Sequence, residues 1–120
     1  KTHYSHLEQK GDFDVARAGW IADYSDPESF LGISVKASGN NYSNFNNEKF
    51  ETLMKEAAAA GGDPAKRYDL LSQAERVLID EVGQIPLLYY SYKNAVSPKI
   101  AGWEDNVMDR HPTRFISKTE

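Results

Sequence analysis

The breaker at residues 61–64, with the sequence Gly-Gly-Asp-Pro, most constrains how this chain can fold, because it separates two stretches with helical periodicity. Paired glycines end helices, whereas an aspartate followed by proline is typical of a helix start. Apolar residues recur at helical spacing on both sides: Phe50, Leu53, Met54 and Ala57 before the breaker, and Leu70, Leu71, Ala74, Val77, Leu78 and Val82 after it. The pattern predicts an antiparallel helical hairpin whose helices are capped by Asn46 and Asp63.

The segments that flank this hairpin have the composition of strands. Residues 12–22 are mostly apolar on both faces, and residues 85–92 are rich in aromatic and branched side chains. We expect shorter strands at residues 94–97 and 113–117, a helix at residues 2–10 and a short helix opening at Pro27. The irregular stretch between the late strands has Trp103 as its expected packing anchor. The order predicts an α/β fold in which a mixed sheet accompanies the helical hairpin.

Composition excludes several classes of function. A net charge of −4 argues against nucleic-acid binding, and the absence of cysteine excludes disulfides, thiolate zinc sites and cysteine nucleophiles. The longest uncharged apolar run, residues 85–90, is too short to cross a bilayer. The chain begins at Lys1 without a methionine, which we interpret as a start inside a longer protein. A missing signal peptide is therefore uninformative.

The segment 14–24 contains the candidate binding residues. Gly19 permits close approach of another backbone, so a ligand in extended form can pair with this stretch. Asp23 can hold a cation and Arg17 can hold a carboxylate. The two charged residues are six positions apart, about 20 Å along an extended chain at ~3.3 Å per residue. This layout matches a zwitterionic, extended ligand such as a short peptide.

Structural interpretations of the same residues remain open. Asp23 also fits a turn-forming residue ahead of Pro27, Arg17 fits one half of an ion pair, and Trp20 fits a core residue. His3 and His6 have too few further ligands nearby for a metal site, and no hydrolase or phosphate-loop motif is present. We therefore predict no catalytic residue, no metal and no cofactor.

The string DFDVARAGWIADYSDPESFL, residues 12–31, strongly resembles the segment of the oligopeptide-binding proteins that supplies much of one wall of the peptide site. The resemblance continues through residues 40–57, 63–103 and 110–117, in the order of the family. The helix patterns are generic. The combination of RAGW, ADY and the later IPLLYY strand is specific to the family.

The resemblance implies an extracytoplasmic substrate-binding subunit of an ABC importer, active in peptide transport. Such proteins have two lobes that close over the ligand, one of them with an extra domain. By resemblance, Asp23 binds the peptide α-amino group, and the backbone of Gly19, Trp20 and Ile21 pairs with the peptide main chain. Trp20 lines a side-chain pocket, and Arg17 meets the C-terminal carboxylate of some short peptides. Ile21 departs from the cysteine of the enteric protein, which puts the pocket shape in doubt.

The resemblance also implies how the chain is organised. Residues 1–120 correspond to the C-terminal part of the binding protein, with most of residues 12–97 in the C-terminal lobe and residues 105–120 returning to the N-terminal lobe. The expected partners are a peptide, the membrane permease and the remaining N-terminal part of the protein; strand-swapped self-association is an option. The expected location is the periplasm, or the cell surface as a lipoprotein.

Other functions remain as alternatives. The same family includes proteins for dipeptides, nickel complexes and oligosaccharides, and a truncated fragment need not bind anything. An enzyme would have to use Asp23 and Asp26 as paired carboxylates, one with a raised pKa. An interaction module that docks through the hairpin would require an exposed apolar patch on it.

Overall fold

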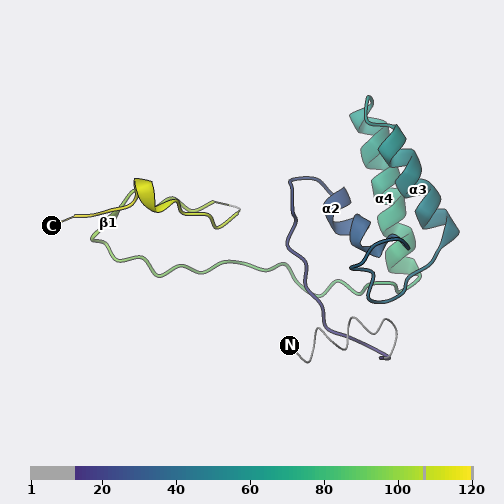
Figure 1. Ribbon diagram of the computed structural model, residues 1–120, viewed down its shortest axis with the longest axis horizontal. Helices are drawn as coiled ribbons and strands as arrows, with labels where there is room; N and C mark the ends of the chain where they lie inside the picture. The colour runs from purple at the N-terminus through teal and green to yellow at the C-terminus, as the bar shows by residue number, and fades with distance from the viewer. Residues whose placement is uncertain (1–12, 107, 120) are drawn as a thin grey trace. The chain divides into compact units, whose positions relative to one another are not determined.

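The computed structural model describes residues 13–106 and 108–119, and it contains two compact units (Figure 1). The helix expected at residues 2–10 lies outside the described residues. The first unit, Lys1–Pro86, contains α2 (Glu28–Leu31), the 3-10 helix η1 (Gly32–Ser34), α3 (Glu48–Ala59) and α4 (Pro64–Asp80). The second unit, Leu87–Glu120, contains β1 (Ile100–Ala101), η2 (Thr113–Phe115) and β2 (Ser117–Lys118).

Side-chain caps begin both long helices. Asp63 accepts a hydrogen bond from the Lys66 amide at 3.1 Å, which confirms the predicted start of α4. The predicted cap of α3 was wrong by one residue: Asn47, not Asn46, accepts from the Phe50 amide, at 3.1 Å. Two adjacent asparagines offer the same side chain, and Asn47 is the one with the extended backbone that a cap requires.

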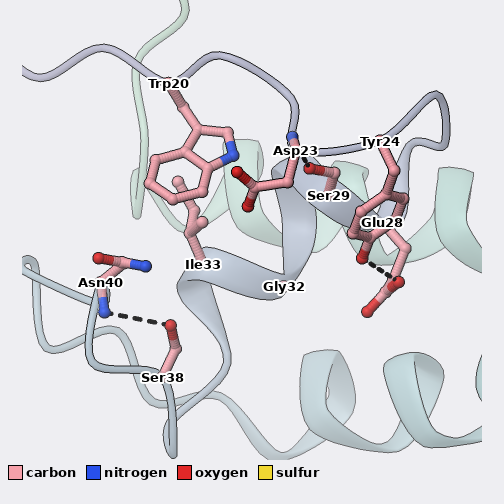
Figure 2. Close-up of a pocket in the computed structure, with 9 residues that line it drawn as sticks. All are labelled: Trp20, Asp23, Tyr24, Glu28, Ser29, Gly32, Ile33, Ser38 and Asn40. Carbon is pink, nitrogen blue, oxygen red and sulfur yellow. Dashed lines mark hydrogen bonds between the residues drawn. The ribbon is translucent and has the colours of Figure 1, made fainter.

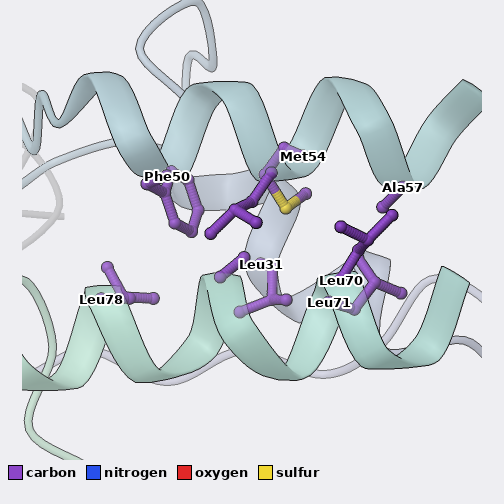
Figure 3. Close-up of a cluster of buried hydrophobic side chains, with 9 residues drawn as sticks. Leu31, Phe50, Met54, Ala57, Leu70, Leu71 and Leu78 are labelled. Carbon is purple, nitrogen blue, oxygen red and sulfur yellow. The ribbon is translucent and has the colours of Figure 1, made fainter. Parts of the chain in front are cut away.

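The core of the first unit lies between α3 and α4, with α2 packed against them (Figure 3). Phe50 is fully buried, and the ring of Phe45 meets it edge to face with the centroids 5.4 Å apart. The predicted apolar stripes supply almost all of the buried set: Leu31, Phe50, Leu53, Met54, Ala57, Leu70, Leu71, Ala74 and Leu78. The antiparallel hairpin is therefore confirmed.

The end of α4 departs from its predicted apolar stripe. Val82 is 65% exposed, and its φ of 55° is a left-handed conformation that glycine usually adopts at this position. Its amide donates to the Ile79 carbonyl, and the amide of Gly83 donates to the Leu78 carbonyl at 2.9 Å. A Cβ on Gly83 would lie 2.5 Å from a ring carbon of Phe45. The close packing at residue 83 thus requires glycine at that position, and the left-handed turn falls on Val82 instead.

The strands expected at residues 12–22, 85–92 and 94–97 do not form in the described part of the chain. The expected strand at residues 113–117 is mostly the 3-10 turn η2, and only Ser117 belongs to a strand. A strand forms only where a neighbouring segment completes its hydrogen-bond ladder, so strand composition alone does not make these segments strands. Leu87 and Tyr89, 81% and 101% exposed, have strand composition without strand pairing.

The second unit is built around a two-residue antiparallel pairing. Ile100 faces Lys118 and Ala101 faces Ser117. Gly102 has a φ of 78°, and a Cβ there would collide with the carbonyl oxygen of Phe115, so this turn requires glycine. No helix in the described residues is long and apolar enough to span a membrane.

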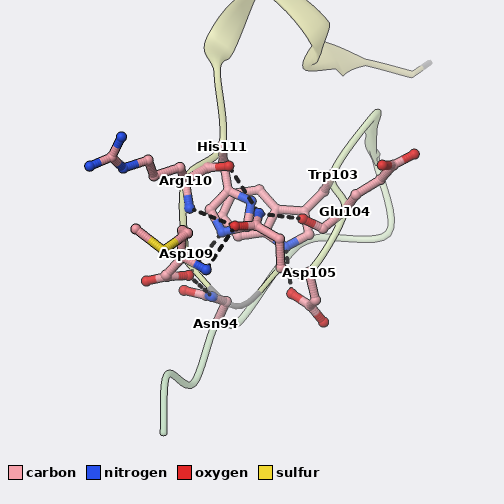
Figure 4. A network of polar contacts seen from close by, with 9 residues as sticks. Asn94, Trp103, Glu104, Asp105, Asp109, Arg110 and His111 are labelled. Carbon is pink, nitrogen blue, oxygen red and sulfur yellow. Dashed lines mark hydrogen bonds and ion pairs between the residues drawn. The ribbon is translucent and has the colours of Figure 1, made fainter. Parts of the chain in front are cut away.

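Trp103 is the packing anchor of the second unit, as predicted (Figure 4). Its indole stacks on the His111 ring at a centroid distance of 3.6 Å and donates a hydrogen bond to Asp105. His111 in turn contacts Asp109 at 2.9 Å, and Asn94 donates to the same carboxylate. His111 and Asn94 lower the pKa of Asp109. The network ties the loop to residue 94, and His111 has two partners in it, the Trp103 ring and the Asp109 carboxylate.

Candidate functional site

An open hollow of about 220 Å³ lies beside α2 (Figure 2). Its lining comes from the loop before α2, from α2 and η1, and from the turn that follows: Trp20, Asp23, Tyr24, Glu28, Ser29, Gly32, Ile33, Ser38 and Asn40. The structure thus brings together two of the five predicted binding residues, Trp20 and Asp23. Arg17, Gly19 and Ile21 are exposed and lie outside this lining.

Asp23 is held by its backbone, which leaves its carboxylate available. Its amide donates to the Ser29 hydroxyl at 2.9 Å, and Ser29 is only 5% exposed. The Ser29 amide donates to the Asp26 carbonyl at 3.1 Å. The turn chemistry expected around Pro27 is therefore present, and it places Asp23 at the edge of the hollow.

Asp26 forms a bidentate ion pair with Arg67 of α4. The two guanidinium nitrogens donate to the two carboxylate oxygens at 2.7 and 2.9 Å. The carboxylate also accepts from the Glu28 amide at 2.9 Å. Arg67, followed by this amide, lowers the pKa of Asp26 from 3.8. Asp26 therefore links the loop that carries Asp23 to the helical hairpin.

This ion pair predicts a pH dependence of stability. The pKa of Asp26 is lower in the folded than in the unfolded chain, so the stabilisation is complete above about pH 4 and is lost as the pH falls through the folded pKa. We expect the melting temperature of the wild type to fall more steeply below that pH than the melting temperature of Asp26→Asn. Circular-dichroism melts across the acid range would measure both, with Glu56→Gln on the exposed face of α3 as a control that follows the wild type. Parallel curves for the wild type and Asp26→Asn would contradict the prediction.

The charges of the hollow are negative. Asp23 and Glu28 line it, and no lysine, arginine or histidine is among its lining residues. The Tyr24 hydroxyl donates to Glu28 at 2.5 Å, and this bond, followed by partial burial and the nearby carboxylates, raises the pKa of Tyr24. Asp26 is neutralised by Arg67, which leaves Asp23 and Glu28 to attract a cation.

Trp20 brings a polar donor to the same hollow. The side chain is half-buried, and its indole nitrogen is buried with no hydrogen-bond partner among the described residues. An unpaired buried donor costs about 1–3 kcal/mol. A hydrogen-bond acceptor that reached this nitrogen would remove that cost.

The sequence interpretation missed the residues that shape the hollow around Trp20 and Asp23. The four-residue spacing of Tyr24 and Glu28 on a helix start is a local signal that could have identified their hydrogen bond. The 41-residue separation of Asp26 and Arg67 leaves no such signal.

A second hollow of about 430 Å³ lies within the second unit, beside the network around Asp109. Its lining is polar and aromatic: Tyr90, Ser91, Tyr92, Asn94, Asp105, Asn106 and Asp109. Several of these side chains are already used by one another or by the neighbouring loop. The described residues contain no group of three or more histidine or acidic side chains that could hold a metal ion.

The chain is similar to known binding proteins, although no family model matches it. It is 35% identical over 94 residues to the periplasmic oligopeptide-binding protein OppA of Salmonella typhimurium, covering 78% of this chain and 17% of that protein. It is 28% identical over 103 residues to the periplasmic murein peptide-binding protein MppA of Escherichia coli, covering 86% and 19%. The chain thus spans less than a fifth of the length of these relatives.

Two solved structures resemble the chain in fold. The crystal structure of a peptide-binding protein of a peptide ABC transporter is 35% identical, with a TM-score of 0.60, covering 68% of this chain and 36% of that one. The unliganded, open form of the periplasmic murein tripeptide-binding protein MppA is 29% identical, with a TM-score of 0.66, covering 84% and 19%.

Proposed function

Because the chain belongs to the family of extracytoplasmic peptide-binding proteins of ABC transporters and shares part of their fold, we propose that it supplies one wall of a peptide site. The peptide lies there in extended form and is delivered to a membrane permease. The chain's short span relative to its relatives supports a role as one part of a larger binding protein.

The observation that carries this proposal is the carboxylate of Asp23 at the edge of a hollow whose lining contains no basic side chain. A cationic group is the favoured occupant of such a place, and a peptide α-amino group provides one. Trp20 adds an unpaired indole donor that fits a peptide carbonyl oxygen. An ammonium and a carbonyl lie close together at the amino end of a peptide.

The remaining predicted contacts extend the ligand away from Asp23. The exposed backbone of Gly19, Trp20 and Ile21 is proposed to pair with the peptide main chain, as an added strand. Arg17, six residues before Asp23, is proposed to meet the carboxylate of short peptides.

The organisation of the larger protein is also a proposal. Residues 1–120 would form its C-terminal part, with most of residues 12–97 in the C-terminal lobe and residues 105–120 returning to the N-terminal lobe. Residues 85–92 support this arrangement, because they have the composition of a strand and are exposed, yet the structure assigns no strand to them. Their pairing neighbour would be the N-terminal part of the protein, or a second copy in a strand-swapped pair. The location would be the periplasm, as in the names of several relatives, or the cell surface through a lipid anchor.

The proposal is tested by titrating unmodified tripeptides and tetrapeptides into the intact protein that contains this chain. We expect micromolar or tighter binding of these peptides, which corresponds to about −8 kcal/mol or below. Free amino acids, a malto-oligosaccharide and a nickel–histidine complex are the matched controls, measured by the same calorimetry. Tight binding of a control ligand without peptide binding would overturn the assignment.

A carboxylate hydrolase is the alternative from another class. Its general acid needs a raised pKa, whereas Arg67 lowers the pKa of Asp26. The relatives named above are binding proteins rather than enzymes. The lowered pKa of Asp26 and the names of the relatives support binding rather than hydrolysis.

A further inference from the structure

We propose that Arg67 and Asp26 are positioning residues for Asp23: their ion pair fixes the loop so that the Asp23 carboxylate meets the ligand ammonium group. This inference rests on the proposed function of Asp23. Neither Arg67 nor Asp26 is among the residues that line the hollow, so both act on the ligand indirectly, through Asp23.

A continuous series of contacts joins Arg67 to Asp23. The guanidinium donates hydrogen bonds to both carboxylate oxygens of Asp26, at 2.7 and 2.9 Å. The Asp26 carbonyl accepts from the Ser29 amide at 3.1 Å, and the Ser29 hydroxyl accepts from the Asp23 amide at 2.9 Å. Each step crosses one hydrogen bond or one residue, so a displacement of Asp26 moves the backbone of Asp23.

The geometry of the ion pair suits a positioning role. Both side chains are about four-fifths buried, with exposed fractions of 20% for Arg67 and 22% for Asp26. Two parallel bonds from a planar guanidinium fix orientation as well as distance, which a lysine ammonium does not. The pair joins residues 41 positions apart, so it fastens the loop to α4, the longest helix of the unit.

The fold itself does not depend on this pair alone. Leu31 of α2 is 6% exposed within the core and anchors the short helix by apolar packing. Loss of the ion pair should therefore leave α2 in place and loosen the residues before it. We expect a loss of affinity on the order of tenfold, the size typical of residues that act through an intervening network.

The test compares Arg67→Met with Arg76→Met in the intact protein. Arg76 is an exposed arginine of the same helix, so the second variant controls for the loss of charge and length. Each variant is titrated with a tripeptide and with its N-acetylated form, which lacks the ammonium group. The inference predicts that Arg67→Met weakens binding of the unmodified peptide about tenfold and leaves the weak binding of the acetylated peptide unchanged. Arg76→Met should match the wild type for both.

Two further variants separate positioning from general loosening. Arg67→Lys should recover part of the lost affinity, because it keeps the charge but not the two-bond geometry. When Asp23 is already replaced by Asn, Arg67→Met should cause no further loss of peptide affinity, because the carboxylate that Arg67 positions is absent. Equal losses for the unmodified and acetylated peptides, or wild-type affinity in Arg67→Met, would overturn the inference. Failure of the proposed function is distinct: the wild type would not bind peptides, or Asp23→Asn would bind them normally.

Discussion

Asp23→Asn is expected to weaken binding of a peptide with a free α-amino group by about a hundredfold, roughly 3 kcal/mol, in the intact protein. The substitution keeps the size of the side chain and the amide that donates to Ser29, so the loop should keep its conformation. It removes the negative charge that would compensate the ligand ammonium when closure excludes water from the site. Isothermal titration calorimetry near neutral pH, with one tripeptide and the two proteins, measures the difference directly.

The matched control for Asp23→Asn is Asp14→Asn, the same change at an exposed aspartate of the same stretch that does not line the hollow. It should bind the peptide like the wild type. An N-acetylated peptide should bind the wild type and Asp23→Asn equally weakly, because the ammonium is absent in both cases. If Asp23→Asn kept wild-type affinity for the unmodified peptide, the proposed role of this carboxylate would be wrong.

The helical hairpin could be predicted because its signals are local. The spacing of Phe50, Leu53 and Met54 and the cap at Asp63 each lie within a few residues of the feature that they specify. The prediction of Asn46 as the cap shows that such signals locate a helix start only to within about a residue, since two adjacent asparagines satisfy them equally. Val82 shows another limit: its spacing fits the buried stripe, but a backbone hydrogen bond from Gly83 turns the chain outward first.

The strands could not be predicted correctly for this chain, because a strand is a property of two segments. Residues 85–92 have strand composition, yet the structure assigns no strand to them, because a strand also needs a neighbouring segment to pair with. The fold class is nevertheless confirmed, because the solved neighbours of the chain are peptide-binding proteins of the periplasmic type. Composition therefore indicated which segments are suited to a sheet, and not which of them form one.

The candidate site could be predicted only where its residues are close together in the sequence. Trp20 and Asp23 are three residues apart, and the structure places both on one hollow. The sequence suggested that Asp26 is a second acid beside Asp23, but the structure pairs its carboxylate with Arg67, 41 residues away in the sequence. Only the packing of α2 on α4 brings those two residues together. The roles of Arg17, Gly19 and Ile21 stay predictions.

Phe50→Ala is expected to destabilise the first unit by about 3–5 kcal/mol. Phe50 is fully buried between the helices, and removal of its ring leaves a cavity next to Leu78 and deprives Phe45 of its edge-to-face partner. Natural domains have about 5–15 kcal/mol of stability in total, so this loss is a large part of what such a unit can have. Urea denaturation followed by far-ultraviolet circular dichroism would show the midpoint shift to a much lower concentration.

Phe30→Ala provides the control for Phe50→Ala, because it removes the same ring from a side chain of α2 that is 48% exposed. Its removal should change the free energy of unfolding by less than about 1 kcal/mol, since much of the ring already faces water. The difference between these two variants isolates the contribution of burial from that of the phenylalanine itself. Similar destabilisation by both would mean that the unit is not held together by the core between α3 and α4. The loop with Asp23 would then lack the rigid support on which its proposed role depends.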